Sequence, residues 1–179
     1  NHGDWEEQAI YKEYQNDRKL LQEVDKVICL SQSTRNLLIA DYQLNPEKTT
    51  VIYNGLKDEG TTTMTSEERK KLKQSLSFDA EDSIILFVGR LDSIKGVDFL
   101  IKAFRKVLKI CPHARLLLAG DGDYNAYLKE CNGIRSRITF TGKVKKEELY
   151  QYYQIADVGV MPSFHEQCSY VGIEMMMHG

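Results

Sequence analysis

The sequence predicts an α/β protein in which a parallel sheet is covered by helices on both faces. Two observations support this fold class. From residue 83 onward, short apolar segments alternate with segments whose apolar residues recur at helical spacing. The short segments are also apolar throughout, so strands formed by them need cover on both faces. Alternation of such strands with helices favours a parallel sheet joined by right-handed crossovers.

The expected strands are compact apolar runs of the length that buried strands have. They are residues 26–31, 49–55, 83–89, 114–120, 138–142 and 157–163. The run at 49–55 ends in an Asn-Gly pair, which is typical of a turn. With 42% hydrophobic residues in 179, the chain has enough apolar side chains to build a core around these strands.

The expected helices lie between these strands and differ in how strongly the pattern indicates them. They are residues 5–23, 33–42, 66–76, 97–110, 124–131, 146–156 and 170–178. The segment 97–110 is amphipathic, because Val97, Ile101 and Phe104 fall on one face of the expected helix. Ser33 and Ser66 are predicted to cap the helices that begin there.

Charge and cysteine content exclude several function classes. The chain carries 24 basic and 26 acidic residues, a net charge of −2, without a basic stripe that would indicate nucleic acid or a membrane surface as partner. No apolar run approaches the roughly 20 residues that span a bilayer. The cysteines have no paired spacing, so we expect free thiols and a cytoplasmic protein. They are Cys29, Cys111, Cys131 and Cys168.

Four loops follow predicted strands and are candidates for a ligand site. In parallel sheets of this kind, ligands bind beyond the carboxyl ends of the strands. The loops are "GRLDSIKG" (89–96), "GDGD" (120–123), "GKV" (142–144) and "SFHEQCSY" (163–170). We expect all four to lie on one rim of the sheet.

The first of these loops places two cations between two glycines. Arg90 offers a planar fork of donors and Lys95 a compact point charge, and the two together suit a diphosphate. Gly89 and Gly96 would allow the backbone to turn and to approach a ligand closely. The alternative is an ordinary solvated loop, and charge alone does not exclude it.

The last loop and the helix after it contain two glutamates, Glu166 and Glu174, separated by seven residues without charge. An ionised carboxylate accepts hydrogen bonds at both oxygens and therefore suits the paired hydroxyls of a ribose or hexose. The start of the helix between them would expose free backbone N–H groups, which favour an anion. Alternatively, Glu174 lies on the solvent face of an amphipathic helix.

Two further features have simpler interpretations. Asp121 and Asp123 resemble an Asp-x-Asp metal element, but two glycines between a strand and a helix first indicate a tight turn. His165 has no evident orienting partner, so we expect a loop residue near the ligand instead of a general base.

Together these motifs resemble the nucleotide-sugar-binding domain of the family-4 retaining glycosyltransferases, which have the GT-B fold of two Rossmann-like domains. The matching pieces occur in the order that the family has. They are "VDKVICLSQSTRNLL", "TTVIYNGL", "FVGRLDSIKGVDFLIKAF", "LLLAGDGD", "ITFTGKV", "YYQIADVGVMPS" and "EQCSYVGIEMMMHG", which cover most of residues 24–179. The last piece resembles a bacterial subgroup of the family.

The resemblance implies a role for each site residue. Arg90 and Lys95 would hold the donor diphosphate and stabilise charge on the leaving group. Glu166 would face the transferred sugar, and Glu174 would bind the ribose hydroxyls. Backbone N–H groups of Ser169, Tyr170 and Val171 would contact phosphate, and the loop of Gly142, Lys143 and Val144 would lie near the base. No cofactor or metal is expected beyond the nucleotide-sugar donor, and the acceptor is unknown.

The resemblance also implies where the chain departs from the family. The family often has Gly-Phe-Gly after the first glutamate, where this chain has Gln167, Cys168 and Ser169, so the phosphate loop is expected to differ in shape. Residues 1–50 would be the tail of the acceptor-binding domain and 51–179 an incomplete donor-binding domain. Weak donor binding at most, and no transfer, are then expected of these residues alone. Peripheral membrane contact through the absent parts stays open, as do two other functions: a non-catalytic nucleotide- or sugar-binding module, and a sugar-nucleotide epimerase.

Overall fold

The structure of the chain is a computed structural model that describes residues 2–57, 64–164, 166 and 168–178, with side chains from residue 12 onward. The chain divides into two compact units, Asn1–Gly55 and Leu56–Gly179. Each unit has a parallel sheet of its own, of two strands in the first and four in the second. Within the described residues, no helix is both long and apolar enough to cross a membrane.

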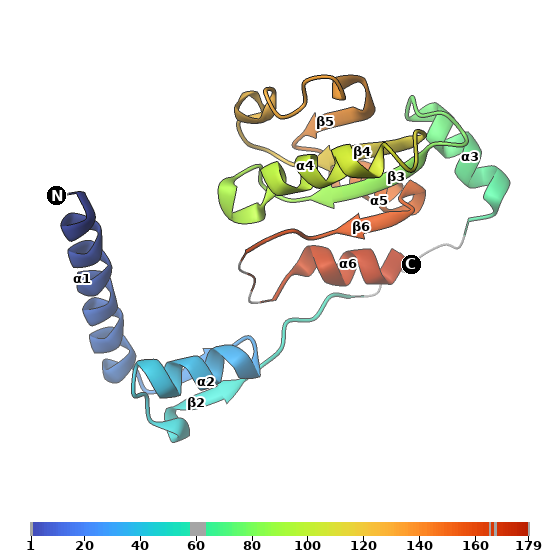
Figure 1. Cartoon of the computed structure of the whole chain (residues 1–179). Coiled ribbons are helices and arrows are strands. Elements are labelled where there is room, and N and C mark those ends of the chain that lie inside the picture. Colours follow the sequence, from blue (N-terminus) through green and yellow to red (C-terminus); the bar gives the residue numbers. More distant parts are fainter. Residues whose placement is uncertain (1, 58–63, 165, 167, 179) are drawn as a thin grey trace. The chain divides into compact units, whose positions relative to one another are not determined.

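The first unit contains two α-helices, a 3₁₀ turn at Pro46–Lys48 and two short strands; Figure 1 labels α1, α2 and β2. The elements are α1 (His2–Glu23), β1 (Val27–Cys29), α2 (Gln32–Asp41) and β2 (Thr49–Val51). The strands pair in parallel, with Val27 opposite Thr49. Helix α2 begins earlier than predicted: the cap is Ser31, whose Oγ accepts a hydrogen bond from the Thr34 N–H at 3.0 Å, and the prediction of Ser33 was wrong.

The strands of the first unit are more exposed than their apolar sequence predicts. Cys29 is buried, but Ile28 is 60% exposed. Ile52, directly after β2, is 53% exposed. A sheet of two strands has little area to bury, and the expectation of strands buried on both faces is wrong here for that reason.

The second unit contains a four-stranded parallel sheet in the order β5-β4-β3-β6 (Figure 1). The strands are β3 (Ser83–Val88), β4 (Ala114–Ala119), β5 (Ile138–Gly142) and β6 (Val158–Val160). The helices are α3 (Ser66–Ser75), α4 (Val97–Val107), α5 (Lys146–Ile155) and α6 (Tyr170–His178). The predicted parallel sheet is confirmed.

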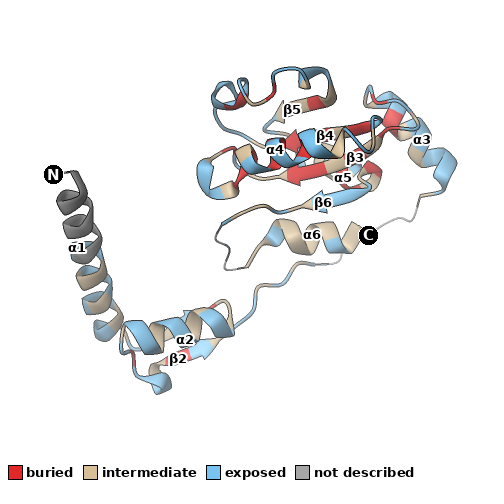
Figure 2. Cartoon of the chain, in the orientation of Figure 1, coloured by how far each residue is buried: buried red, intermediate tan, exposed pale blue. Residues whose placement is uncertain are grey.

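Side chains of the central strands alternate between two cores, one on each face of the sheet. Figure 2 shows that β3 and β4 contain many of the buried residues of this unit. Phe87 of β3 packs with the apolar face of α4, whereas Leu86 packs on the opposite side with residues of α3, α5 and α6. Both residues are at most 1% exposed. Helices therefore cover both faces, as predicted, and β3 and β4 form the fully buried centre.

Two helix predictions need correction. Helix α3 is capped by Thr65, not Ser66: the Thr65 Oγ accepts from the Glu68 N–H, while the Glu68 carboxylate accepts from the Thr65 N–H. This reciprocal capping box fixes the first turn one residue earlier. The predicted helix at 124–131 is only a 3₁₀ turn, Tyr124–Tyr127, followed by turns up to Ile134, among which Gly133 has φ +76°.

Charged side chains gather at the amino ends of the strands in the second unit. Asp157, directly before β6, accepts hydrogen bonds from the Ile84 N–H at 2.7 Å and from the Arg69 guanidinium at 2.9 Å, and pairs with Lys73 at 3.3 Å. Burial alone would raise the pKa of Asp157, but these hydrogen bonds and charges outweigh it and lower the pKa. The carboxylate therefore joins α3, β3 and β6.

Asp82 has a similar role at the neighbouring strands. Its carboxylate is 1% exposed and lies directly before β3, where it pairs with Arg115 of β4 at 3.0 Å and with Arg137 at 3.9 Å. A buried carboxylate of this kind is tolerated only when it is paired and hydrogen-bonded. These contacts join β3, β4 and β5 at the amino edge of the sheet, opposite the loops that follow the strands.

Candidate functional site

The loops after β3, β4 and β5 meet at the carboxyl edge of the sheet. The Gly120 N–H donates to the Gly142 carbonyl at 3.1 Å, and the Leu91 N–H donates to the Asp121 carbonyl at 2.8 Å. A Cβ atom at Gly120 would lie 1.8 Å from the Gly89 carbonyl oxygen, so the backbones approach too closely for any side chain there. The three strand ends thus form one rim.

The loop after β6 is joined to the loop after β3 by backbone contacts. The Phe164 N–H donates to the Ile94 carbonyl at 2.9 Å. Gly96 adopts a left-handed conformation with φ +67°, and a Cβ atom there would lie 2.4 Å from the Pro162 carbonyl oxygen. All four candidate loops therefore belong to one continuous rim, in the strand order of the sheet.

Lys95 and Glu166 meet across this junction. The Lys95 Nζ lies 2.5 Å from the Glu166 Oε1, and the two side chains are 24% and 30% exposed. The residues are 71 positions apart in the sequence. A cation and a carboxylate at the strand ends are thus held as a partly solvated ion pair.

Asp92 organises the two cations of the first loop. Its Oδ1 accepts a hydrogen bond from the Lys95 N–H at 3.0 Å, and its Oδ2 lies 3.3 Å from the Arg90 guanidinium. The Arg90 side chain remains 77% exposed. Arg90 is therefore accessible to a ligand at the rim, and its carboxylate partner is Asp92.

The start of α6 is capped by a residue that departs from the family's glycine. The Ser169 Oγ accepts a hydrogen bond from the Gly172 N–H at 3.2 Å. Among the described residues, the N–H groups of Tyr170 and Val171 have no backbone partner, as expected in a first helical turn. Ser169 thus acts as an acceptor that orders the first turn of α6.

Glu174 lies one turn further along α6 and does not simply face solvent. Its Oε2 accepts a hydrogen bond from the Tyr153 hydroxyl at 2.7 Å. Tyr153 is 4% exposed, and burial followed by the hydrogen bond to Glu174 raises the pKa of its phenol. The phenol is therefore a neutral donor at ordinary pH.

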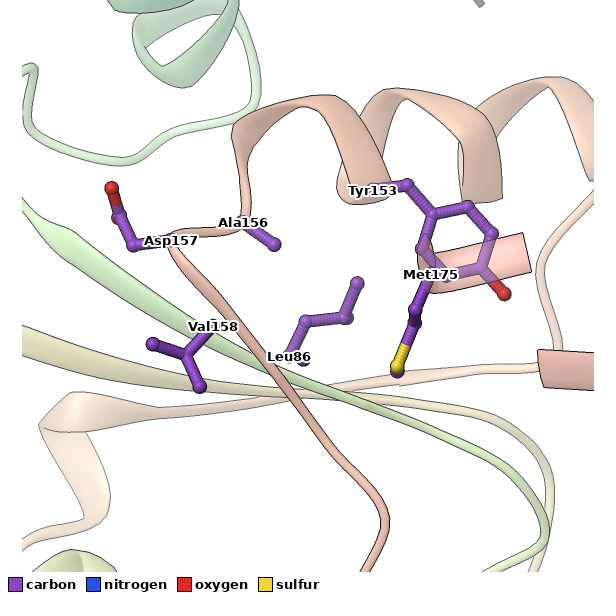
Figure 3. Close-up of a pocket in the computed structure, with 7 residues that line it drawn as sticks. Leu86, Tyr153, Ala156, Asp157, Val158 and Met175 are labelled. Carbon is purple, nitrogen blue, oxygen red and sulfur yellow. The ribbon is translucent and has the colours of Figure 1, made fainter. Parts of the chain in front are cut away.

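Helix α6 packs closely on β6 through small residues. A Cβ atom at Gly159 would lie 2.6 Å from the Met175 Sδ, and one at Gly172 would lie 2.9 Å from the Met161 Sδ. Tyr153 of α5 and Met175 of α6 line a small cavity beside Leu86 of the sheet (Figure 3). At about 30 Å³ it has room for a water or two, not for a nucleotide.

The remaining predicted residues are placed as follows. Gly142 ends β5 with φ +69°, Lys143 after it is exposed, and Val144 packs against the core under α5. The Asp121 and Asp123 side chains each accept a hydrogen bond from a nearby backbone N–H, those of Gly122 and Asn125, as a turn requires. In the part of the chain that the structure describes, no group of three potential metal ligands occurs. His165 and Gln167 lie outside the described residues.

Sequence reasoning missed Asp92 and Tyr153. Asp92 had a signal, because an aspartate three residues before Lys95 suits a cap of the short 3₁₀ turn Ser93–Lys95. No sequence signal indicated the role of Tyr153. Helical periodicity places its ring in the core but does not indicate that its hydroxyl reaches a residue of another helix.

The parallel sheet covered by helices on both faces is a fold that this chain shares with solved glycosyltransferases of the GT-B class. The chain belongs to the glycosyl transferases group 1 family, whose model matches residues 82–179. A second model, glycosyltransferase family 4, matches residues 1–59. The resemblance seen in the sequence motifs is confirmed.

Individual relatives agree with this assignment. An uncharacterized glycosyltransferase of Methanocaldococcus jannaschii is 35% identical over 158 residues, which is 86% of this chain and 40% of the relative. The alpha-monoglucosyldiacylglycerol synthase of Streptococcus pneumoniae is 31% identical, with 90% of this chain and 37% of the relative covered. The chain thus spans about two fifths of the length of these relatives.

Among solved structures, HepE from Anabaena in complex with UDP and glucose is similar to this chain. The TM-score is 0.72 at 25% identity, covering 87% of this chain and 42% of that chain.

Proposed function

We propose that the full-length protein transfers a sugar from a nucleotide-sugar donor to an acceptor with retention of the anomeric configuration. The observation that carries this proposal is the junction at the rim, where Arg90 is exposed beside the ion pair of Lys95 and Glu166. The family membership and the UDP complex of the Anabaena neighbour support it.

In this proposal the cations act on the leaving group. As the bond between the sugar and the diphosphate breaks, negative charge grows on the departing phosphate, and Arg90 and Lys95 stabilise that charge. The backbone N–H groups of Tyr170 and Val171 at the start of α6 would add dipoles of the same sign. The acceptor oxygen bonds to the anomeric carbon as the bond to the diphosphate breaks, and the acceptor proton passes to an oxygen of the departing phosphate.

The carboxylates and the third loop would recognise the rest of the donor. Glu166, which already reaches Lys95, would contact the transferred sugar, and Glu174 would accept hydrogen bonds from the ribose hydroxyls. Gly89 would let the first loop approach the phosphates, and the loop of Gly142–Val144 would lie beside the base. We propose that transfer needs no metal.

Two proposals concern the whole protein. The free thiols of all four cysteines support a cytoplasmic protein. Because the chain spans about two fifths of its relatives' length, we also propose that residues 1–179 alone bind donor weakly and do not transfer it.

Calorimetry on the full-length protein with UDP- and GDP-sugars tests the proposal. Binding should be lost in Arg90→Ala and Lys95→Ala but kept in Lys102→Ala, a lysine on α4 that pairs with Asp98. Wild-type affinity in both rim variants would overturn the role of the cations. Product analysis by NMR then reports the anomeric configuration, and binding without transfer, or a changed sugar without an acceptor, would contradict transferase activity.

A further inference from the structure

Tyr153 and Glu174 form the contact between α5 and α6 on which this inference is built. The contact joins residues 21 positions apart, and both belong to elements of the second unit. The hydroxyl donates to one carboxylate oxygen, Oε2, and among the described residues Tyr153 is the one donor to this carboxylate. An ionised carboxylate has about four acceptor positions, so Glu174 keeps acceptor capacity for a ligand.

The phenol is held in place from several sides. Tyr153 is 4% exposed and belongs to the core on the α5 side of the sheet. The His178 ring stacks on it with centroids 5.1 Å apart and an interplanar angle of 21°. A side chain that is packed in this way cannot rotate freely, so its hydroxyl presents one fixed hydrogen bond to Glu174.

Helix α6 itself offers less restraint. In the described part of α6 no residue is fully buried, and Glu174 is only half-buried. A glutamate side chain has three rotatable bonds and loses rotamer freedom when it binds a ligand. A hydrogen-bond donor that is anchored in the core, such as the Tyr153 hydroxyl, can restrict the glutamate rotamers before the ligand arrives, so binding then costs less side-chain entropy.

We propose that Tyr153 is a positioning residue that orients the Glu174 carboxylate toward the ribose 2′- and 3′-hydroxyls of the donor and so determines the preference for ribonucleotides over deoxyribonucleotides. The inference rests on the proposed function, because it needs Glu174 to bind the ribose. It adds a residue outside the rim loops, on the helix behind them. Tyr153 touches neither donor nor acceptor and acts through Glu174.

A matched pair of variants tests the inference. Tyr153→Phe removes the hydroxyl and keeps the ring. Tyr152→Phe removes the neighbouring hydroxyl, which is similarly buried at 7% exposure and donates to Glu148 on the same helix, away from α6. The full-length protein is titrated with UDP, GDP and ADP, and then with the 2′-deoxy form of the nucleotide that binds best.

The expected result is a change in discrimination, which a purely structural role would not produce. Tyr153→Phe should bind the ribonucleotide about 10-fold more weakly, and binding of the 2′-deoxy form, which still offers its 3′-hydroxyl to Glu174, should be weakened by a smaller factor. The measure of discrimination is the affinity for the ribonucleotide divided by the affinity for its 2′-deoxy form. Tyr152→Phe should keep the wild-type value of this ratio, and Glu174→Gln should lower it at least as much as Tyr153→Phe. Melting temperatures of the two tyrosine variants show whether both remain folded.

The outcomes separate the inference from the proposed function. Wild-type discrimination in Tyr153→Phe overturns the inference while leaving nucleotide binding intact. Equal losses in both tyrosine variants, in step with their melting temperatures, also overturn it, because lost packing would then explain the effect. Failure of the wild-type protein to bind any of the three nucleotides contradicts the proposed function, and the inference falls with it.

Discussion

The two glutamates of the candidate site occupy opposite environments. Glu166 lies in a loop, and its partly exposed carboxylate meets the charged amine of Lys95. Glu174 lies in a helix, and its carboxylate meets the neutral, buried hydroxyl of Tyr153. The first contact pairs the Lys95 amine, which a phosphate could also bind, whereas the second fixes the direction of the Glu174 carboxylate.

Two identical side chains can therefore serve different purposes in one site. An ion pair near solvent is weak and is exchanged easily when a ligand brings a competing anion. A hydrogen bond anchored in the core is held by the packing and persists when the ligand binds. We therefore expect substitutions around Glu166 to change charge balance, and substitutions around Glu174 to change geometry.

The largest effect is expected from removing the cation of the exposed pair. Lys95→Ala should lower kcat/KM for donor about 100-fold, because it removes a phosphate partner and leaves the Glu166 carboxylate to repel the diphosphate. Steady-state kinetics on the full-length protein measure the loss. A drop no larger than that of Lys102→Ala would show that the rim lysine has no special role in the reaction.

The junction that brings Lys95 to Glu166 should be the next most sensitive position. Gly96→Ala should lower the free energy of unfolding by about 2 kcal/mol, because the new methyl group meets the Pro162 carbonyl and the left-handed backbone becomes strained. Urea denaturation measures the change. Gly133→Ala is the control: φ is +76° there too, but the nearest atom is 3.9 Å away, so about 1 kcal/mol of strain is expected. Equal losses in both variants would mean that the Pro162 contact is unimportant.

Removing the charge of Glu166 should separate binding from turnover. In Glu166→Gln, Lys95 loses its counter-charge, so the nucleoside diphosphate should bind about threefold more tightly. Transfer should be about 10-fold slower if the carboxylate acts on the sugar in the transition state. Calorimetry and product formation are measured on the same preparation, with Glu174→Gln alongside, which should bind the nucleotide more weakly. Tighter binding in both variants, or in neither, would erase the contrast between the two glutamates.

A smaller effect is expected at the opposite edge of the sheet. The pKa of Asp157 is lower in the folded protein than in the unfolded chain, so its stabilising contribution is complete above the unfolded value of about 3.9 and fades as the pH falls below it. Asp157→Asn should lower the free energy of unfolding at pH 7 by about 1 kcal/mol and reduce the further loss in acid. Denaturation curves at a series of pH values measure both. An unchanged slope in acid would show that another carboxylate governs acid stability.

The central strands could be predicted from the sequence almost to the residue. The segments that form β3 and β4 are apolar because both faces are covered, and this leaves a continuous pattern that needs no knowledge of partners. The 124–131 segment shows the limit of such reasoning. Its composition suits a helix, but Asp123 hydrogen-bonds the Asn125 N–H and Gly133 takes a left-handed conformation, so only a short turn forms.

The rim could also be predicted, but the pairing within it could not. That the loops share one edge follows from the direction of parallel strands. The contact of Lys95 with Glu166 depends on how closely Gly96 approaches Pro162, which is a property of packing. The partner of Glu174 was likewise hidden, because a buried tyrosine in an amphipathic helix normally indicates a core side chain and nothing more.

The positions of Asp82 and Asp157 affect how proteins with this fold can change in evolution. Their ion pairs join the strands at the edge farthest from the rim loops, so the network that holds the sheet together shares no residue with the one that would meet a substrate. A lineage could therefore exchange side chains along the rim, and with them its preferred sugar, without loosening the scaffold beneath.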